Sequence, residues 1–369
     1  MDNKLKKALF LCNSSAGLYE FRSELLRSLL AEGYEIHVSC PDRVKTDLLE
    51  GLGCRIIPTA IDRRGVNPMR DLKLVLFYKK LVRRLRPDIV LTYTIKPNVY
   101  GGYVCGRAGV PYISTITGLG TAFQKEGLLL YLVQLLYRTG LKKAACVFFQ
   151  NTENRELFHN YGLVAGKDRL VSGSGVNLQD FRFLPYPKND ETRFLFVGRV
   201  MQEKGIDEYF AAADALSSDK VSFSIAGYCD DDYQEKLDAM VKKGSIRMLG
   251  LQKDMHPVYE KCSAVVLPTW HEGMSNVLME SSACGRPVIA SSISGCREIF
   301  ENGVTGFGFA PKSSQDLIRA LREFLRMSRS ERAVMGESAR RKMEREFDRK
   351  KVTAAYMEEI GKAVKNGKA

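Results

Sequence analysis

The stretch Arg193-Phe-Leu-Phe-Val-Gly-Arg-Val-Met-Gln-Glu-Lys-Gly205 indicates how the second half of the chain folds. Its apolar run over 193–199 is typical of a strand buried on both faces of a sheet. Gly198 and Arg199 close this run, and the polar residues after them predict a turn into a helix. Helical patterns then alternate with further strand candidates at 221–227, 246–250, 264–269 and 287–292. Such alternation predicts a parallel sheet covered by helices on both faces.

The first half of the chain has the same rhythm. Its strand candidates are 7–12, 35–40, 55–61, 88–94, 111–117 and 145–151, and its helical patterns are 18–32, 44–51, 70–86, 98–109, 127–143 and 152–161. Two prolines and a polar cluster over 183–191 interrupt the alternation, as a linker does. We therefore predict an α/β protein with two doubly wound, Rossmann-like domains, 1–182 and 192–345, facing each other across a cleft. A helix from 346 to 369 is expected to pack back on the first domain.

Length and composition limit the class of protein. A chain of 369 residues exceeds one ordinary core and suits two domains. Nine scattered cysteines without a Cys-x-x-Cys pair favour reduced thiols in the cytoplasm over disulfides or a zinc site. The N-terminus runs straight into a strand pattern, so we expect no signal peptide. No apolar stretch approaches the ~20 residues of a membrane span. We expect a cytoplasmic protein that is soluble or peripheral to the membrane.

The formal net charge of +13 suggests an anionic partner, although an unspecialised basic surface would give the same value. No nucleic-acid-binding motif is recognisable, so we do not expect nucleic acid. Two helical patterns, 72–86 and 127–143, are both basic and apolar. They suit the surface of an anionic membrane, and we expect a peripheral location on the inner face of the plasma membrane; helices that simply cover a sheet are the alternative.

The segment Leu267-Pro-Thr-Trp-His-Glu-Gly-Met-Ser-Asn-Val-Leu-Met-Glu280 leaves a strand and enters a helix near 275–276. The free N–H groups and the dipole of a helix N-terminus suit a diphosphate, and Gly273 lets the backbone approach it closely. Glu280 in the helix could accept hydrogen bonds from a ribose, and Glu272 on the loop from a sugar. Two solvated glutamates would have the same spacing, so this spacing alone is weak evidence.

Arg199 and Lys204 follow the strand at 193–199 and are expected at the same sheet edge as this segment. A departing nucleoside diphosphate needs fixed cations where its negative charge develops. Surface cations near a helix start are the alternative, which the neighbouring glutamate segment disfavours.

Taken together, Gly198-Arg199…Lys204-Gly205 and Glu272-Gly273…Glu280 resemble the retaining glycosyltransferases of family 4, which have the GT-B fold. The likeness covers nearly the whole chain. It extends to Gly175-Val-Asn177 with Phe181, to Ala283–Ala290 and to Gly303–Gly306.

The resemblance implies roles for the motif residues. Arg199 and Lys204 would bind the donor diphosphate, Glu280 the ribose, and Glu272 the transferred sugar near its reacting face. We therefore predict Glu272, Arg199 and Lys204 as catalytic. The predicted donor-binding residues are Gly17, Gly198, Arg199, Lys204, Gly250, Glu272, Gly273, Met274, Ser275, Asn276, Val277 and Glu280.

Asn13-Ser-Ser-Ala-Gly17 and Gly118-Leu-Gly120 resemble the bacterial branch that builds lipid-linked oligosaccharides, including the N-acetylgalactosaminyl transferases of protein N-glycosylation. This resemblance implies a UDP-sugar donor, carrying an N-acetylhexosamine or a hexose, and a polyprenyl-diphosphate-linked saccharide as acceptor. Lys96 follows a strand and is either a ligand for the acceptor diphosphate or a solvated loop lysine. The predicted acceptor-binding residues are Asn13, Ser15, Lys96, Thr117 and Gly118.

One departure concerns the reacting centre. Many members of the family have a histidine after the fifth strand of the first domain, whereas 113–120 contains none. Thr117 and Gly118 stand there instead, which leaves the proton acceptor open. A sugar-nucleotide epimerase, which can share the two-domain fold, is the alternative function.

Asp230-Asp-Asp232 is compatible with the Asp-x-Asp metal clamp of some glycosyltransferases. It also opens a helix, where acidic residues complement the dipole in any case. Because Arg199 and Lys204 can neutralise a diphosphate, we expect no metal and no other cofactor.

Overall fold

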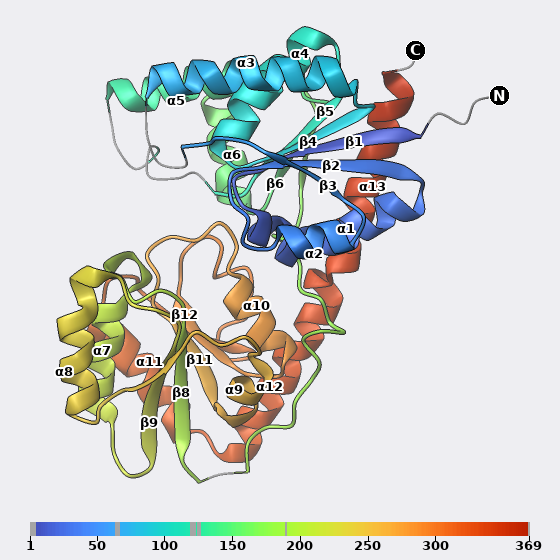
Figure 1. Ribbon diagram of the computed structural model, residues 1–369. Coiled ribbons are helices and arrows are strands. Elements are labelled where there is room, and N and C mark those ends of the chain that lie inside the picture. The colour runs from blue at the N-terminus through green and yellow to red at the C-terminus, as the bar shows by residue number, and fades with distance from the viewer. Residues whose placement is uncertain (1–4, 63–66, 119–122, 124–126, 189, 368–369) are drawn as a thin grey trace. The chain divides into compact units, whose positions relative to one another are not determined.

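The computed structural model describes residues 5–62, 67–118, 123, 127–188 and 190–367. The chain divides into two units. Residues 1–174 and 350–369 form the first, the N-terminal unit, and residues 175–349 form the second, the C-terminal unit. Each unit has a parallel β-sheet with helices packed against it (Figure 1).

The sheet of the N-terminal unit has the strand order β3-β2-β1-β4-β5-β6-β7, with every neighbouring pair parallel. Its strands are β1 (Lys6–Leu11), β2 (Tyr34–Cys40), β3 (Arg55–Pro58), β4 (Ile89–Tyr93), β5 (Tyr112–Ile116), β6 (Cys146–Phe149) and β7 (Asp168–Leu170). The order reverses between β1 and β4. In doubly wound sheets, ligands bind beyond the carboxyl ends of the strands at such a switch point.

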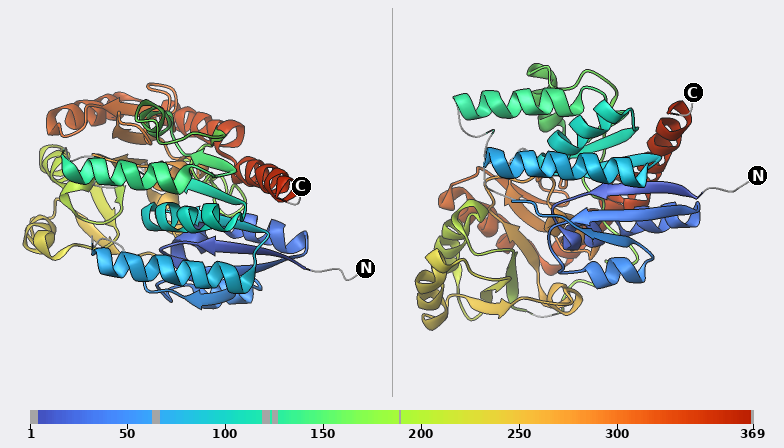
Figure 2. Two further views of the ribbon diagram at one scale, coloured as in Figure 1. Left: turned by 90° about the horizontal axis from the view of Figure 1, so that it is seen from above. Right: turned by 45° about the horizontal axis from the view of Figure 1, so that its top comes forward.

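Helices cover both faces of this sheet, and Figure 2 shows them from two further directions. The helices are α1 (Ser15–Ala31), α2 (Thr46–Gly51), α3 (Pro68–Leu85), α4 (Gly102–Ala108), α5 (Leu128–Leu141), α6 (Thr152–Asn160) and α13 (Arg349–Asn366), with a π-helical turn at Pro97–Gly101 leading into α4. One core joins the sheet to α1, α2 and α13. The opposite face packs on α3 and α4, and further along on α5 and α6.

The C-terminal helix α13 belongs to the N-terminal unit. Its Tyr356 is fully buried, stacks on Phe148 with ring centroids 4.1 Å apart, and shares a 2.7 Å hydrogen bond with the Thr115 hydroxyl. Glu359, only 3% exposed, accepts hydrogen bonds from Lys167 and Arg169. Aromatic packing and buried charge therefore dock α13 onto strands that precede it by about 200 residues.

The C-terminal unit repeats the doubly wound arrangement, with all pairs parallel in the order β10-β9-β8-β11-β12-β13. Its strands are β8 (Thr192–Val197), β9 (Val221–Ala226), β10 (Arg247–Gly250), β11 (Ala264–Leu267), β12 (Val288–Ser291) and β13 (Gly306–Phe309). Its helices are α7 (Ile206–Leu216), α8 (Gln234–Lys242), α9 (His256–Lys261), α10 (Asn276–Ala283), α11 (Ser314–Arg326) and α12 (Arg329–Lys342). Short helical turns span Gln202–Lys204, Asp231–Tyr233 and Met343–Phe347.

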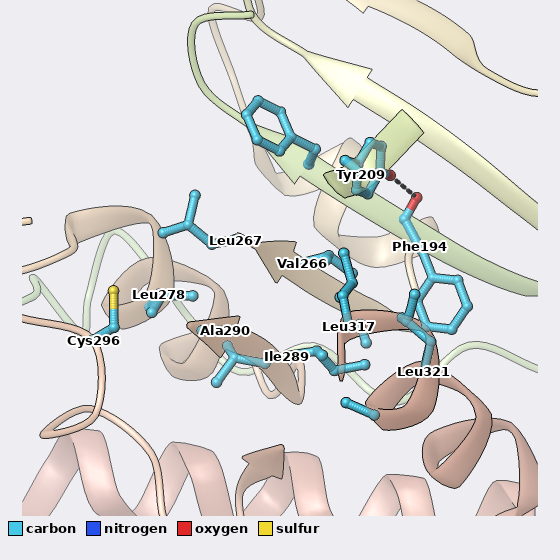
Figure 3. Packing of buried hydrophobic residues seen from close by; sticks show 14 of the residues in the cluster. Phe194, Tyr209, Val266, Leu267, Leu278, Ile289, Ala290, Cys296, Leu317 and Leu321 are labelled. Atoms are coloured by element: carbon cyan, nitrogen blue, oxygen red, sulfur yellow. Dashed lines mark hydrogen bonds between the residues drawn. The ribbon is translucent and has the colours of Figure 1, made fainter. Parts of the chain in front are cut away.

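The main core of the C-terminal unit lies between the sheet and helices α7, α8, α10, α11 and α12. Figure 3 shows Val266 and Ile289 of adjacent strands meeting Leu317 and Leu321 of α11. The buried hydroxyl of Tyr209 donates to the Phe194 carbonyl at 3.2 Å, which satisfies a polar group inside this core.

The predicted doubly wound α/β fold is confirmed, and every predicted strand is present. Two strands were missed, β7 and β13. β7 is a three-residue edge strand that starts with a charged pair, and β13 reads Gly-Phe-Gly-Phe, so neither has the apolar run of a buried strand. Within the described residues, no helix has the length and apolarity needed to cross a membrane.

The division between the units falls at 174/175, earlier than the linker expected at 183–191. Val176 hydrogen-bonds to Phe347 and Arg349, which attaches the chain to the C-terminal unit directly after the boundary. Farther along, Arg286 is completely buried and donates hydrogen bonds to the carbonyls of Leu184 and Pro185. These bonds hold the proline-containing segment on the C-terminal unit. Asn189 lies outside the described residues.

Candidate active site

Three glycines stand at the carboxyl ends of adjacent strands β8, β9 and β10. The Gly198 N–H donates to the Ala226 carbonyl, and the Gly227 N–H to the Gly250 carbonyl, both at 2.9 Å. A Cβ on Gly227 would lie 1.9 Å from the Gly198 oxygen, so the backbones pack where no side chain fits. Glycines at such an edge let a ligand approach the backbone closely. The predicted Gly198 and Gly250 therefore share this edge with Gly227, which was not predicted.

Lys204 and Glu272 are in direct contact at the same edge. The Lys204 ammonium lies 2.5 Å from a Glu272 carboxylate oxygen, and both side chains are partly buried. Gly205 fixes the turn that presents Lys204, because its φ is +71° and a Cβ there would lie 1.9 Å from the Pro268 carbonyl oxygen. The close approach of this turn to the end of β11 is what joins two motifs 68 residues apart.

Arg199 lies after β8 and makes a looser ion pair. Its guanidinium is 3.5 Å from the Asp230 carboxylate and 5.9 Å from the centroid of the Tyr228 ring. Asp230 is thereby engaged by a cation. Among the described side chains, which exclude that of Asp231, no cluster of three or more His, Cys, Asp or Glu is placed to hold a metal ion.

Helix α10 begins at Asn276, a few residues after Glu272 in the sequence, and Ser275 is its N-terminal cap. The Ser275 hydroxyl accepts from the Leu278 N–H at 3.4 Å, while the Ser275 N–H donates to the Gly295 carbonyl at 2.8 Å. The N–H groups of Asn276 and Val277, in the first turn, have no acceptor within the helix and suit a phosphate. Ser275 and Met274 are buried, so a ligand would meet their backbone rather than their side chains.

Glu280 lies one turn into α10 and is partly buried. Burial raises the pKa of the Tyr259 hydroxyl well above its usual range, and the nearby Glu280 carboxylate raises it further. Glu280 therefore lies near Tyr259 of α9, whereas Glu272 lies on the loop before α10. Glu272 and Glu280 thus have different neighbours, and their different roles stay predictions.

The loop after β12 supports the site and was missed from the sequence. Glu298 accepts hydrogen bonds from the Gly295 N–H at 2.8 Å and the Ser294 hydroxyl at 3.2 Å. Gly295 has a φ of +83°, and a Cβ there would lie 2.8 Å from the carbonyl oxygens of Glu272 and Gly273. The loop therefore holds the backbone that carries Glu272. A Gly-x-x-Glu spacing after a buried strand is the signal that was available.

The N-terminal unit has a cavity of about 240 Å³ at the carboxyl ends of β1, β4 and β5. It is lined by Asn13, Ile61, Thr94, Ile95, Lys96, Pro97, Thr117 and Gly118. Four of the five predicted acceptor-binding residues are therefore brought together at the switch point of this sheet. Leu119 and Gly120, from the quoted Gly-Leu-Gly sequence, lie outside the described residues.

Ser15 and Gly17 do not line this cavity. The Ser15 hydroxyl and N–H both donate to the Asp42 carboxylate, and the Gly17 N–H donates to the hydroxyl of Ser14, the cap of α1. Both residues therefore serve the start of α1 in this structure, and a ligand role for them stays a prediction.

Lys96 is not the solvated loop lysine of the alternative interpretation, and its role as a ligand for the acceptor diphosphate stays a prediction. Its side chain is only 14% exposed, and its ammonium lies 2.6 Å from the Asp71 carboxylate. The other Asp71 oxygen accepts a hydrogen bond from the Tyr100 hydroxyl at 2.9 Å. Thr94, which lines the same cavity two residues before Lys96, has a φ of +72°. This value is strained for a β-branched residue, and strain of this kind is common at functional sites.

Two Rossmann-like units, each with its candidate ligand-binding residues at the carboxyl edge of its sheet, are the architecture of the GT-B class. Two family models match the chain: "Glycosyl transferase 4-like" over residues 7–151 and "Glycosyl transferases group 1" over residues 191–327. The chain therefore belongs to the glycosyltransferases that these models describe, and it is an enzyme of that family.

Two curated relatives are similar over most of the chain. The N,N'-diacetylbacillosaminyl-diphospho-undecaprenol alpha-1,3-N-acetylgalactosaminyltransferase of Campylobacter jejuni is 27% identical over 84% of this chain and 86% of its own length. The UDP-Gal:alpha-D-GlcNAc-diphosphoundecaprenol alpha-1,3-galactosyltransferase of Escherichia coli is 26% identical over 79% of this chain and 80% of its own. These relatives give no support to the epimerase alternative.

Solved structures agree on the fold. A glycosyltransferase from Rickettsia africae superposes with a TM-score of 0.79 at 17% identity, over 98% of this chain and 100% of its own. Anabaena HepE in complex with UDP-glucose superposes with a TM-score of 0.78 at 18% identity, over 96% and 99%.

Proposed function

We propose that this glycosyltransferase moves an N-acetylhexosamine or a hexose from a UDP-sugar to a polyprenyl-diphosphate-linked saccharide, with retention at the anomeric carbon. The names of the Campylobacter and Escherichia relatives, which act on undecaprenol-diphosphate-linked sugars, support this acceptor class. UDP-Gal in the name of the latter, and UDP-glucose bound to HepE, support the donor class.

The observation that carries the proposal is the Lys204–Glu272 contact at the glycine edge. The sugar diphosphate would lie over that edge and the start of α10, with Arg199 and Lys204 facing the phosphates. As the bond between the anomeric carbon and the phosphate oxygen breaks, both cations stabilise the charge that develops on the diphosphate. Glu272, held by Lys204, orients the hydroxyls of the donor sugar. Glu280 binds the ribose.

Retention follows if the acceptor hydroxyl attacks the face from which the diphosphate departs. Attack from that face brings the hydroxyl beside the departing phosphate oxygen, which is gaining negative charge. That oxygen can then take the hydroxyl proton while the new glycosidic bond forms. No side chain is needed as the base, which agrees with the absence of a histidine from 113–120.

The test is a panel of UDP- and GDP-sugars incubated with polyprenyl-diphosphate-linked mono- and disaccharides, read by product mass. The anomeric coupling in the NMR spectrum of the product reports retention. Inversion would contradict the mechanism, and turnover only with GDP-sugars would contradict the donor class. A parallel incubation without acceptor shows whether the nucleotide sugar itself is converted, as an epimerase would do.

We extend the proposal to transfer without a metal. Arg199 and Lys204 supply the positive charge that a divalent ion would bring to the diphosphate. Turnover should be unchanged after dialysis against EDTA. A loss that Mg²⁺ or Mn²⁺ restores would contradict this part of the proposal and leave the transfer itself intact.

The enzyme would act as a peripheral protein on the cytoplasmic face of the membrane. Apolar side chains are exposed along α3, at Met69, Leu72 and Leu76, and along α5, at Tyr131 and Leu132. Helix α4 lies between these two helices and contacts both (Figure 2). Exposed cations on α3 flank the apolar residues at Lys73, Lys79, Lys80, Arg83 and Arg84. Apolar residues framed by cations suit an anionic bilayer surface, and nine free cysteines suit a reducing compartment.

Vesicle sedimentation tests this location. Wild-type protein should sediment with phosphatidylglycerol-containing vesicles, less with pure phosphatidylcholine vesicles, and less at high salt. The double variant Leu72→Glu/Leu76→Glu should stay in solution, whereas Val334→Glu, an exposed apolar position on α12, should sediment like the wild type. Equal sedimentation of both variants would contradict this choice of surface.

A further inference from the structure

The only tryptophan of the chain, Trp270, lies in the loop between β11 and α10, two residues before Glu272. Its backbone N–H donates to the Glu203 carbonyl at 2.9 Å, which ties the loop to the turn after β8. Its indole N–H donates to a carboxylate oxygen of Glu208 at 3.1 Å, and the Lys312 ammonium lies 4.7 Å from the centroid of its ring. Trp270 therefore joins the loop of Glu272 to α7 and to the segment after β13.

Glu208 is an unusual residue for its position. It is 5% exposed in the first turn of α7, and its neighbours Ile206, Tyr209 and Phe210 belong to the main core of the unit. One carboxylate oxygen accepts from the Trp270 indole, whereas the other is buried and has no hydrogen-bond partner among the described residues. The helix dipole offsets only part of the cost of burying a charge. An apolar residue would serve the core better, so packing does not explain why Glu208 is there.

The contact between Glu208 and Trp270 acts on the loop that carries Glu272. Because Glu272 follows Trp270 by two residues, the position of the indole limits where the Glu272 carboxylate can lie. Lys204 holds that carboxylate by its charge, and Gly295 packs against the backbone that bears it. A displacement of about 1 Å in a group that orients a reacting sugar is enough to slow turnover strongly. The indole contact is thus a third restraint on the predicted sugar ligand.

We infer that Glu208 is a positioning residue for the transfer, because it holds the Trp270 indole and thereby sets the place of Glu272. The inference rests on the proposed role of Glu272 and deepens it. Since Glu208 is buried, it acts through the loop and touches neither the sugar nor the diphosphate. Its carboxylate serves as a hydrogen-bond acceptor, so an uncharged acceptor of the same shape should replace it.

Three variants separate this role from a role in folding, each assayed with the donor and acceptor that give product in the transfer assay. Glu208→Leu should lower kcat about tenfold and leave the acceptor KM unchanged, because the predicted acceptor-binding residues lie in the N-terminal unit. Its thermal stability should be kept or raised, since an apolar side chain replaces a buried charge. Glu208→Gln still accepts from the indole and should turn over like the wild type. Trp270→Phe keeps an aromatic ring without the N–H and should be as slow as Glu208→Leu.

The double variant Glu208→Leu/Trp270→Phe should be no slower than either single variant, because both changes remove the same hydrogen bond. Acrylamide quenching of the Trp270 fluorescence gives a readout without substrate. It should increase in Glu208→Leu and stay at the wild-type level in Glu208→Gln. Tyr209→Phe is the matched control, since it removes buried hydrogen bonds from the next residue of α7. It should lower the melting temperature and leave kcat unchanged.

Wild-type kcat in both Glu208→Leu and Trp270→Phe would overturn the inference. Equal losses in Glu208→Gln and Glu208→Leu would also overturn it, because the charge rather than the indole contact would then matter. Glu272→Ala, measured alongside, distinguishes this result from a failure of the proposed function. A normal rate in Glu272→Ala refutes the role of Glu272 itself, whereas a slow Glu272→Ala beside fast Glu208→Leu and Trp270→Phe refutes only its positioning.

Discussion

The two units share one topology but build their ligand-binding edges differently. In the C-terminal unit the edge consists of backbone: Gly198, Gly227 and Gly250 carry no side chain, and a Cβ on Gly227 would collide with the Gly198 carbonyl oxygen. In the N-terminal unit the edge consists of side chains around a cavity, with Asn13 and Lys96 in its wall. A bare backbone suits a diphosphate, which N–H groups and fixed cations recognise. A cavity lined by polar side chains suits a ligand such as a sugar, which is recognised by hydrogen bonds to its hydroxyl groups.

Alanine variants of Lys204 and Glu272 should give the largest effect at the C-terminal edge. Lys204→Ala should lower kcat by about 10²–10³-fold, the range found when one preorganised stabilising group is removed. Glu272→Ala should have an effect of similar size. Both side chains are partly exposed, so thermal unfolding should change little. Near-normal rates for both variants would show that the chemistry does not depend on this edge.

Gly295 tests whether backbone packing positions the donor edge. In Gly295→Ala the new Cβ would press on the carbonyls of Glu272 and Gly273 at a φ of +83°. We expect destabilisation of about 1–3 kcal/mol, as in other overpacked sites. Displacement of Glu272 should also lower kcat by about 10-fold or more. Steady-state kinetics and thermal unfolding measure the two effects.

Gly244 provides the matched control for that variant. Its φ is +81°, but a Cβ there would have no atom within 4 Å. Gly244→Ala should therefore cost about 1 kcal/mol of conformational strain and leave kcat unchanged. If both alanine variants lowered kcat equally, left-handed strain alone would explain the loss, and close packing at Gly295 would not.

The sequence predicted the C-terminal edge better than the N-terminal one, for physical reasons. Gly198, Arg199 and Lys204 follow one strand closely and Glu272 follows another, so parallel topology places them at one edge. Asp71 lies in a helix 25 residues before Lys96, and nothing in their spacing predicts that they meet. Glu298 acts through a loop backbone, which a residue pattern does not reveal. The strained φ of Thr94 depends on tertiary packing.

Glu359 tests how the far end of the chain supports the N-terminal unit. Burial acts to raise the pKa of this carboxyl, but hydrogen bonds from Lys167 and Arg169 outweigh it and hold the pKa below the usual value. A lowered folded-state pKa stabilises the fold above the unfolded-state pKa, about 4.3, and this contribution is lost as the pH falls through the folded-state value. Glu359→Gln should therefore destabilise the docking of α13 by about 1.5–3 kcal/mol at pH 7, and less below pH 4.

Amide exchange in α13 at pH 7 measures this docking, and denaturant unfolding followed down to pH 3 gives its pH dependence. Glu358→Gln is the neighbouring control, because that carboxylate is about half exposed and its ion pairs should matter less. A destabilisation by Glu359→Gln that did not shrink on acidification would show that shape, rather than charge, docks the helix.

A variant of Thr94 should give the smallest effect. It tests a difference in backbone strain between the two edges. At the donor edge the left-handed positions are glycines, whereas at the cavity Thr94 adopts a φ of +72° with a β-branched side chain. Relief of such strain is worth about 1–2 kcal/mol, of which the greater chain entropy of glycine cancels part. Thr94→Gly should thus stabilise the protein slightly, by about 1 kcal/mol or less, while raising the KM for the acceptor. Lys312→Gly, at a φ of +61° in the C-terminal unit, should leave that KM unchanged and stabilise less, because it also removes the Lys312 ammonium from the Trp270 ring, 4.7 Å away. If Thr94→Gly left the acceptor KM unchanged, the strain at Thr94 would have no part in acceptor binding, and the two edges would differ only in their lining.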